Sequence, residues 1–391
     1  MLLALPDQEQ SQSHRVHPAL FKTTDKLIHW NQNHSNLILL FFLLLTLGFG
    51  LGLKDLHVET KPISYYKKGS AIRNAFEYFD ANFRGSTTID ILLNGPAGAF
   101  KDPQNLKAVE KILNEYQKDD RVSPPLTAID YLKRANQALH DGDLAFFKIP
   151  ESQEEIAQVY LFLEGEEAFS DVLRDEYSEL RLTSRIQALG SRVGSQIMMR
   201  LEKILNQNLP KGISFTVTGT NVVWANMENY IADSLTRSFV GTIILVTIMM
   251  MLVLKSWKWG LISMIPNLVP IVMVFGLMGW VGIPLNMITL MIASIAIGIA
   301  VDDTIHLTIH IRKKTTEGMG LDDAIVSAFH HIGLAVISTS VILALGFLTM
   351  VISSFIPTQQ FGFYTALTVV FALLCDLLLL PAVLKLFQRV L

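Results

Sequence analysis

The chain has 391 residues, of which 50% are hydrophobic and only 17% are charged, and its formal net charge is −3. This slight negative charge, without any block of basic residues, excludes a nucleic-acid binder that works by charge attraction. The apolar residues fall into runs close to or above the ~18 residues that predict a helix crossing a bilayer. The single cysteine, Cys375, lies in the last of these runs, so no disulfide forms within the chain.

The first apolar run, residues 37–53, predicts a membrane helix preceded by an N-terminal segment, residues 1–36. A signal peptide is disfavoured because a long segment precedes the run and no small-residue cleavage site follows it. A hydrophilic stretch, residues 54–233, then leads to a membrane region at 234–388. Five further spans are predicted there, at 235–254, 259–281, 285–311, 332–352 and 361–387. The fold class is therefore an α-helical membrane protein with a six-helix bundle.

The distribution of Lys and Arg predicts the orientation of these helices. The loops at 282–284 and 357–359 carry no charge, whereas the basic residues fall on the opposite side. They are Arg15, Lys22, Lys26, Lys255, Lys258, Arg312, Lys313, Lys314, Lys385 and Arg389. By the positive-inside rule, both termini are predicted to be cytoplasmic and residues 54–233 extracytoplasmic. We expect a multi-pass protein of the cell (inner) membrane.

Residues 54–233 show a mixed α+β pattern. Strands are predicted at 87–93, 159–163, 180–186 and 213–217, and helices at 106–116 and 189–209, with extra helices inserted between 124 and 156. The order strand–helix–strand–strand–helix–strand is that of a ferredoxin-like βαββαβ domain.

No nucleophile-and-base set occurs in residues 54–233, so we predict neither an enzyme nor a cofactor. Four acids there form either a cation patch or, as we favour, a solvated face: Glu164, Glu166, Glu167 and Asp171.

The fourth span contains the most informative run, residues 291–310, MIASIAIGIAVDDTIHLTIH. Two adjacent acids, Asp302 and Asp303, are followed one turn later by His306. A charged residue near the centre of a bilayer costs at least ~2.5–3.5 kcal/mol and marks ion pathways. Burial disfavours the charged form of a carboxyl group, and a second acid beside it disfavours that form further. The pair is therefore predicted to bind and release a proton as a coupled unit.

Helical spacing predicts one polar stripe along this span, formed by Ser294, Gly298, Asp302, His306 and His310. Counting from residue 286, Asp302 lies ~24 Å along the helix, nearer its cytoplasmic end. One alternative is that the acids are structural and border water-filled space. Another is a zinc site, which is disfavoured because no fourth ligand is evident. We predict no metal.

Other spans supply candidate partners for these acids. Thr339 and Ser340 lie in the fifth span, and Asp376 lies midway through the sixth, where an unpaired acid would be expensive. Asn267 stands between two prolines of the third span and is predicted to hydrogen-bond carbonyls freed by a kink, which is an architectural role.

With the run from Gly298 to His306, GIAVDDTIH, the chain resembles the resistance-nodulation-division (RND) superfamily. It is most similar to the branch that holds the mycobacterial-membrane-protein-large (MMPL), hopanoid-exporter and sterol-sensing-domain-like proteins. The resemblance implies export of lipid-like or hydrophobic molecules driven by a proton gradient, with Asp302 as the proton carrier. Asp303 stands where many of the family's exporters carry a tyrosine.

The chain differs from the family in size, because it holds one six-span unit and one outer domain where the family usually has two. Residues 1–6, MLLALP, resemble the end of a sixth span, as if a preceding unit had been cut away. The resemblance therefore implies a homodimer, a complex with a separate first-half RND subunit, or a truncated half. Membrane lipids and a hydrophobic substrate are the other expected partners. The alternative function is a non-transporting lipid-binding or sterol-sensing-like module in which the acids are structural.

Overall fold

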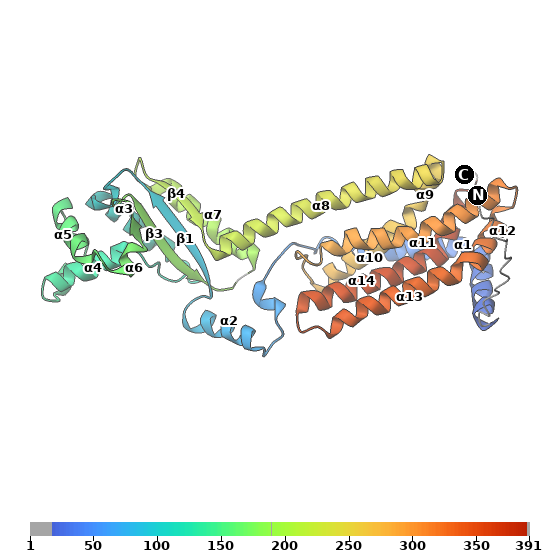
Figure 1. Cartoon of the computed structure of the whole chain (residues 1–391), viewed down its shortest axis with the longest axis horizontal. Helices are drawn as coiled ribbons and strands as arrows, with labels where there is room; N and C mark the ends of the chain where they lie inside the picture. The colour runs from blue at the N-terminus through green and yellow to red at the C-terminus, as the bar shows by residue number, and fades with distance from the viewer. Residues whose placement is uncertain (1–17, 189, 389–391) are drawn as a thin grey trace, which may run out of the picture.

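The computed structural model describes residues 18–188 and 190–388, so the sixth-span resemblance of residues 1–6 lies outside the described part. The molecule is elongated, with a unit of sheet and helices at one end and a helical bundle at the other (Figure 1). One long helix, α8 (Thr220–Val253), runs from the sheet into the bundle.

Among the described residues, six helices are long and apolar enough to cross a membrane. They are Trp30–Gly52, Thr220–Val253, Trp257–Val281, Met291–Thr316, Leu321–Ile352 and Ile356–Leu386. The predicted six-helix membrane protein is thereby confirmed, although the boundaries shift. The first is part of α1 (Pro18–Gly52), which is kinked at His34, and the third joins α9 (Trp257–Ser263) to α10 (Ile265–Val281).

The fourth membrane helix, α11 (Met291–Thr316), begins later than expected. The side chain of Asn286 accepts hydrogen bonds from the backbone N–H groups of Ile288 and Thr289, both at 2.9 Å. These bonds hold a turn ahead of the helix, because an Asn side chain competes with helical backbone pairing. Asp302 therefore lies about 17 Å from the start of the helix, near its middle, and the expected displacement toward one end is wrong.

The fifth and sixth membrane helices each contain a short π-helical segment. The fifth consists of α12 (Leu321–Ala328), the π-helical η4 (Phe329–Gly333), α13 (Leu334–Leu348) and the 3₁₀ turn η5 (Thr349–Ile352). The sixth consists of α14 (Ile356–Leu374), the π-helical η6 (Cys375–Leu379) and α15 (Leu380–Leu386). Such segments are rare in proteins, but those that occur are frequently found at functional sites. Here one carries His330 and His331 and the other carries Asp376.

Glycine allows α1 and α10 to touch backbone to backbone. A Cβ atom on Gly276 would lie 1.9 Å from the carbonyl oxygen of Phe49, and one on Gly279 would lie 1.9 Å from that of Gly52. Small residues at such crossings are how membrane helices gain close packing without a hydrophobic driving force. This contact fixes α10 against α1 and hence positions Asn267.

The sheet unit contains four antiparallel strands in the order β2-β3-β1-β4. They are β1 (Thr87–Asn94), β2 (Leu173–Arg174), β3 (Glu179–Ile186) and β4 (Ser214–Thr218). The helices α3 (Pro103–Tyr116) and α7 (Ser191–Asn208) bury their apolar sides in the same core as the strands. Along the chain, the order is β1, α3, β2, β3, α7, β4.

Shorter elements complete this unit. Between α3 and β2 lie α4 (Ala128–Leu139), η3 (Leu144–Phe146), α5 (Gln153–Leu163) and α6 (Glu167–Ser170), and η2 (Ala99–Lys101) follows β1. The linker from α1 contains η1 (Pro62–Tyr65) and α2 (Ala71–Asn82). The predicted helices between 124 and 156 are thus present, and the last of them, α5, continues to Leu163.

The predicted strand at 159–163 is wrong, because these residues end α5. The hydroxyl of Ser152 accepts the N–H of Glu155 and begins the helix, and two acids in the first turn suit its positive end. Ile156, Val159 and Tyr160 are buried at helical spacing. Leu161 is exposed, so the apparent alternation did not reflect a buried face. The strand that replaces it is the two-residue β2.

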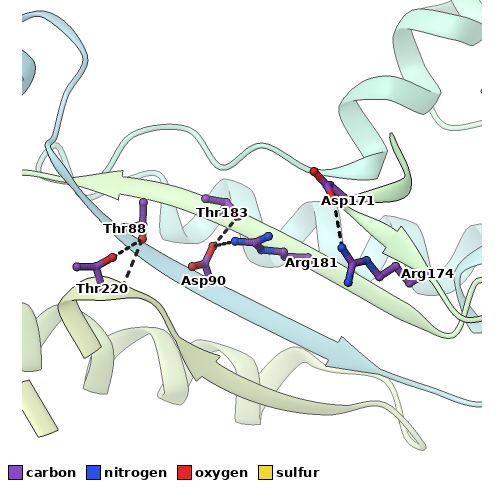
Figure 2. A network of polar contacts seen from close by, with 7 residues as sticks. All are labelled: Thr88, Asp90, Asp171, Arg174, Arg181, Thr183 and Thr220. Carbon is purple, nitrogen blue, oxygen red and sulfur yellow. Dashed lines mark hydrogen bonds and ion pairs between the residues drawn. The ribbon is translucent and has the colours of Figure 1, made fainter. Parts of the chain in front are cut away.

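Polar contacts hold β1 to β3 and to the beginning of α8 (Figure 2). Asp90 on β1 accepts hydrogen bonds from Thr183 at 2.6 Å and from Arg181 at 3.2 Å, both on β3. Thr88 bonds the hydroxyl of Thr220, the first residue of α8, at 3.4 Å. Asp171, expected on a solvated acidic face, forms an exposed ion pair with Arg174.

Gly219 makes the close approach of α8 to the sheet possible. Its φ of +106° lies in the region that favours glycine, and a Cβ atom there would stand 2.8 Å from the backbone of β1. The first turn of α8 is therefore fixed against the sheet.

Candidate functional site

Asp376 is the most deeply buried acid of the bundle among the residues whose burial is described, and it joins three membrane helices. Its side chain is 1% exposed, and its Oδ1 atom lies 2.6 Å from the hydroxyl of Thr304 on α11. The same hydroxyl lies 2.8 Å from Oδ1 of Asn267 on α10. The second oxygen of Asp376 has no hydrogen-bond partner among the described residues. These contacts link η6, α11 and α10 deep within the bundle.

The hydroxyl of Thr304 has one proton but several acceptors around it. Nδ2 of Asn267 donates to the carbonyl oxygen of Ser263 at 2.9 Å, which turns Oδ1 toward Thr304. The carbonyl oxygen of Ala300, 3.0 Å from the same hydroxyl, is a third acceptor. A hydroxyl donates only one hydrogen bond, so Thr304 satisfies only one of Asn267, Asp376 and Ala300. A proton on Asp376 would let both contacts be hydrogen bonds, with Asp376 donating to Thr304. The arrangement thus suits a carboxyl group that gains and loses a proton.

Asp303 contacts the fifth membrane helix, where the sequence placed its partners. It is half-buried, and the hydroxyl of Ser340 donates to its Oδ2 at 2.8 Å. The hydroxyl of Thr339 is 3.5 Å from its Oδ1 and also 2.9 Å from the carbonyl oxygen of Ala335, so its contact with Asp303 is the weaker one. The structure thus brings Asp303, Ser340 and Thr339 together.

Asp302 and His306 lie on the open face of α11, which is the face that no other described helix of the chain covers. Their side chains are 75% and 64% exposed, and Oδ1 of Asp302 is 3.7 Å from Nε2 of His306. The expectation that Asp302 is buried is therefore wrong for the single chain. Successive residues of a helix project about 100° apart, so Asp302, Asp303 and Thr304 point in three directions. Asp302 points to the open face, Asp303 to α13 and Thr304 to the core.

The zinc ligand set does not form. His310 bonds the hydroxyl of Ser327 at 3.0 Å, and its ring stacks on that of His331 with 5.2 Å between centroids. Across residues 18–188 and 190–388, no three His, Cys, Asp or Glu side chains are grouped in a way that would hold a metal ion.

Thr304 and its contact with Asn267 were missed by the sequence reasoning. The signal was present in part, because Ala300, Thr304 and Thr308 form a second stripe at four-residue spacing, and all three are buried. Asn267 does bond a backbone carbonyl as expected. Its contact with Thr304 depends on how three helices pack, which no local pattern encodes.

An apolar cavity of about 370 Å³ lies at the end of the bundle nearest the sheet. Leu53 and Leu56 border it from the end of α1 and the linker. The other walls come from α8, α10 and the start of α11, and include Leu235, Phe239, Phe275 and Ala293. The hydroxyl of Thr236 is the only side-chain polar group among its described lining residues. The cavity fits a hydrocarbon chain better than a polar solute.

Six membrane-crossing helices, buried acids at the contacts between them and an apolar cavity define a polytopic membrane protein. The chain belongs to the MMPL family, whose profile matches residues 151–390. The matched region includes all five membrane helices after the sheet unit and both π-helical segments. The predicted membership of the MMPL branch of the RND superfamily is thus confirmed.

Curated relatives agree with this assignment. A membrane protein of Methanocaldococcus jannaschii is 24% identical over 379 residues, which cover 93% of this chain and 94% of that protein. The hopanoid transporter HpnN of Burkholderia multivorans is 23% identical over 194 residues, or 49% of this chain and 22% of the transporter. The multidrug resistance protein MdtC of Pectobacterium atrosepticum is 28% identical over 148 residues, or 37% of this chain and 14% of MdtC. The chain therefore matches the archaeal protein along nearly all its length and only a small part of the other two.

Proposed function

We propose that this chain is one half of an RND-type exporter that moves lipid-like or hydrophobic molecules across the cell membrane, driven by a proton gradient. The observation that carries the proposal is the contact of Asp376, Thr304 and Asn267, in which one hydroxyl proton has both side chains and a backbone carbonyl as acceptors. A buried acid in such a setting changes its hydrogen bonds when it changes its protonation state. Because three helices meet there, a proton that binds or leaves alters their packing. The names of two relatives, a hopanoid transporter and a multidrug resistance protein, support this reading.

The proposal assigns separate tasks to the acids. Asp302 carries the coupling proton, as the family resemblance implies, and Asp303 and His306 tune it. Asp376 responds to the charge of that pair from inside the bundle, supported by Thr304, while Thr339 and Ser340 hold Asp303. The proton gradient is the only energy source required, without a cofactor or a catalytic group.

The sheet unit serves as the porter domain in this proposal. A ferredoxin-like fold with an insertion before β2 is part of the proposal, supported by the strand order and by the sequence of strands and helices. The apolar cavity, at the end of the bundle nearest that domain, provides a place for a substrate taken from the membrane. A lipid-binding module without transport is the second candidate, which the cavity alone would also support.

Purified chain in lipid vesicles, together with any first-half subunit, is expected to move a fluorescent lipid only when a pH gradient is imposed, and to do so as an assembly of two units. The reason for the second unit is that Asp302 and His306 are exposed on a membrane helix, where an uncovered acid is not tolerated. The covering surface is a second copy or a separate first-half subunit. Mass measurement in nanodiscs checks the assembly. Full transport by a monomer, or transport that ignores the gradient, would contradict the proposal.

The orientation is tested by single cysteines placed at Gln117 and Asp141 in a Cys375→Ser background. Both positions lie in the sheet unit, which the positive-inside rule places outside the cell. A membrane-impermeant maleimide is expected to label both in intact cells. A cysteine at Lys314, at the other end of the bundle, is the matched control and should react only after permeabilisation. The reverse pattern would show that the sheet unit is cytoplasmic.

A further inference from the structure

A polar pocket of about 440 Å³ lies at the end of the bundle away from the sheet unit, where α9 and α12 lie in Figure 1. Ser256 borders it from the turn between α8 and α9, Arg312 from the end of α11, and Gln388 from just beyond α15. The loop before α12 contributes Met319. The pocket therefore lies where the ends of five of the membrane helices come together, and neither the acids nor the apolar cavity includes it.

Arg312 brings a positive charge to this pocket. Its guanidinium group donates a hydrogen bond to the carbonyl oxygen of Lys255 at 3.1 Å, and it forms no ion pair with an acid in the described part of the chain. A guanidinium group has five N–H donors in a planar fork that matches two oxygens of a phosphate group. The hydroxyl of Ser256 and the amide of Gln388 are further donors that border the same pocket. Three segments thus supply donors to one space.

Thr315 and Thr316, which also line the pocket, supply acceptors instead. The hydroxyl of Thr315 donates to the carbonyl oxygen of Arg312 at 2.8 Å, and that of Thr316 donates to the carbonyl oxygen of Lys313 at 2.7 Å. A hydroxyl has one proton, so each of these oxygens is left to accept a hydrogen bond from a ligand. A ligand that suits the pocket therefore combines phosphate oxygens with hydroxyl groups of its own.

Positive charge predominates around the pocket. Residues 255–259, 312–323 and 385–388 hold six Lys or Arg side chains and three acids, and six minus three leaves a net charge of +3. Two of the acids are paired, Glu317 with Lys314 at 2.9 Å and Asp322 with Lys385 at 3.2 Å. The surroundings therefore favour a ligand with a net negative charge over a zwitterion whose ammonium group they repel.

The pocket lies at the level expected of lipid head groups. Trp259 lines it and Trp257 stands beside it, and tryptophan is enriched where membrane helices meet the head groups. Apolar side chains next to the pocket are exposed, among them Trp257, Met319 and Leu386, which come from three different segments. The acyl chains of a lipid can lie against these side chains while its head group enters the pocket. Basic pockets between membrane helices bind anionic head groups in this way.

We propose that this pocket binds the head group of an anionic phospholipid, with its phosphate on Arg312 and its head-group hydroxyls on Thr315 and Thr316. Phosphatidylglycerol has this chemistry. The lipid comes from the leaflet that the positive-inside rule identifies as cytoplasmic. Because the ends of several membrane helices meet at the pocket, the bound lipid stabilises the bundle at this end. The site is independent of the proposed export function, since it uses neither the acids nor the apolar cavity.

The test measures lipid binding to the full-length chain by native mass spectrometry after purification in a neutral detergent. The probes are phosphatidylglycerol and phosphatidylcholine with identical acyl chains. Wild type is expected to bind phosphatidylglycerol about tenfold more tightly, roughly what one charge-assisted contact provides. Arg312→Gln removes the charge and should abolish this preference. Phosphatidylglycerol should also raise the melting temperature of wild type more than phosphatidylcholine does, and Arg312→Gln should lose that difference.

Lys313→Gln is the matched control, because Lys313 is the next residue of α11 and its exposed side chain does not line the pocket. It removes the same charge and should leave most of the preference in place. If Arg312→Gln does not fold, Arg312→Lys decides: it keeps the charge but not the planar fork, and should reduce the preference severalfold. Equal reductions by the variants at 312 and 313 would show that general surface charge attracts the lipid, and would overturn the site.

Glycerol 1-phosphate distinguishes a lipid from a soluble phosphate, because it has a phosphate and hydroxyls without acyl chains. It should compete with phosphatidylglycerol only at concentrations far above that of the lipid. Displacement of the lipid at equal concentration would identify a site for a soluble phosphate and refute the lipid assignment. Equal binding of the two lipids by wild type would refute it as well.

Discussion

Asp302→Asn is expected to reduce transport driven by a pH gradient to background while leaving folding and membrane insertion intact. Asn has nearly the shape of Asp but does not ionise, so it neither takes up nor releases a proton. The side chain is 75% exposed in the single chain, so the change leaves no unsatisfied group within it. Reconstituted vesicles measured with and without the gradient, with any partner subunit present, give the readout.

Asp303→Asn is the comparison for Asp302→Asn, because the two acids are adjacent on α11. Asn at position 303 still accepts the hydrogen bond from Ser340, so we expect a smaller loss of transport. Gradient-dependent transport by Asp302→Asn at the wild-type rate would show that Asp302 is not the carrier. The lipid-binding module would then be the better description of the protein.

Thr304→Val is expected to lower the free energy of unfolding by about 2 kcal/mol or more, the largest stability effect that we predict in the bundle. Valine matches the shape of threonine but has no hydroxyl, so Asp376 and Asn267 both lose their contact with it. A buried polar group left without a partner costs about 1–3 kcal/mol. Unfolding in mixed micelles with increasing dodecyl sulfate measures the change.

Thr308→Val is the control for this effect. Thr308 lies one turn further along α11, is equally buried, and bonds only the carbonyl oxygen of Thr304. Its replacement removes a single local hydrogen bond, so the destabilisation should be clearly smaller. Equal losses in the two variants would mean that the contact with Asp376 does not contribute to the larger destabilisation.

Asp376→Asn should keep the fold, because the amide of Asn at this position donates to Thr304, yet transport should fall to an intermediate level.

The membrane helices were predictable because hydropathy over about 20 residues is a local property of the chain. The ends of these helices were less predictable. The turn that the Asn286 side chain holds delays the start of α11 by several residues. In the sheet unit, α3, α7, β3 and β4 follow their periodicity closely. The strand at 159–163 did not, because alternation over five residues does not distinguish a strand from a helix whose apolar side chains are partly exposed.

The site was predictable in its residues and less so in its geometry. The acids and hydroxyls stand out from sequence because polar groups are rare in apolar helices. Their directions follow from packing, which places Asp302 on the open face and Asp376 in the core. Thr304 was overlooked because a threonine in a membrane helix ordinarily bonds the carbonyl one turn back, as this one also does. Its second role exists only where α10, α11 and η6 meet.

The unbroken course of α8 has a mechanical consequence for the proposed transport cycle. Its 34 residues form a rod about 51 Å long, fixed at one end to the sheet through Thr88. At the other end, Arg312 of α11 donates a hydrogen bond to the carbonyl oxygen of Lys255, just beyond the rod. A rotation of 10° about that end moves Thr220 by about 9 Å, far more than any side chain moves when it binds a proton. In the export cycle that we propose, small changes at α11 would therefore be enlarged at the sheet, and a proton's arrival would displace the sheet unit without a second moving part.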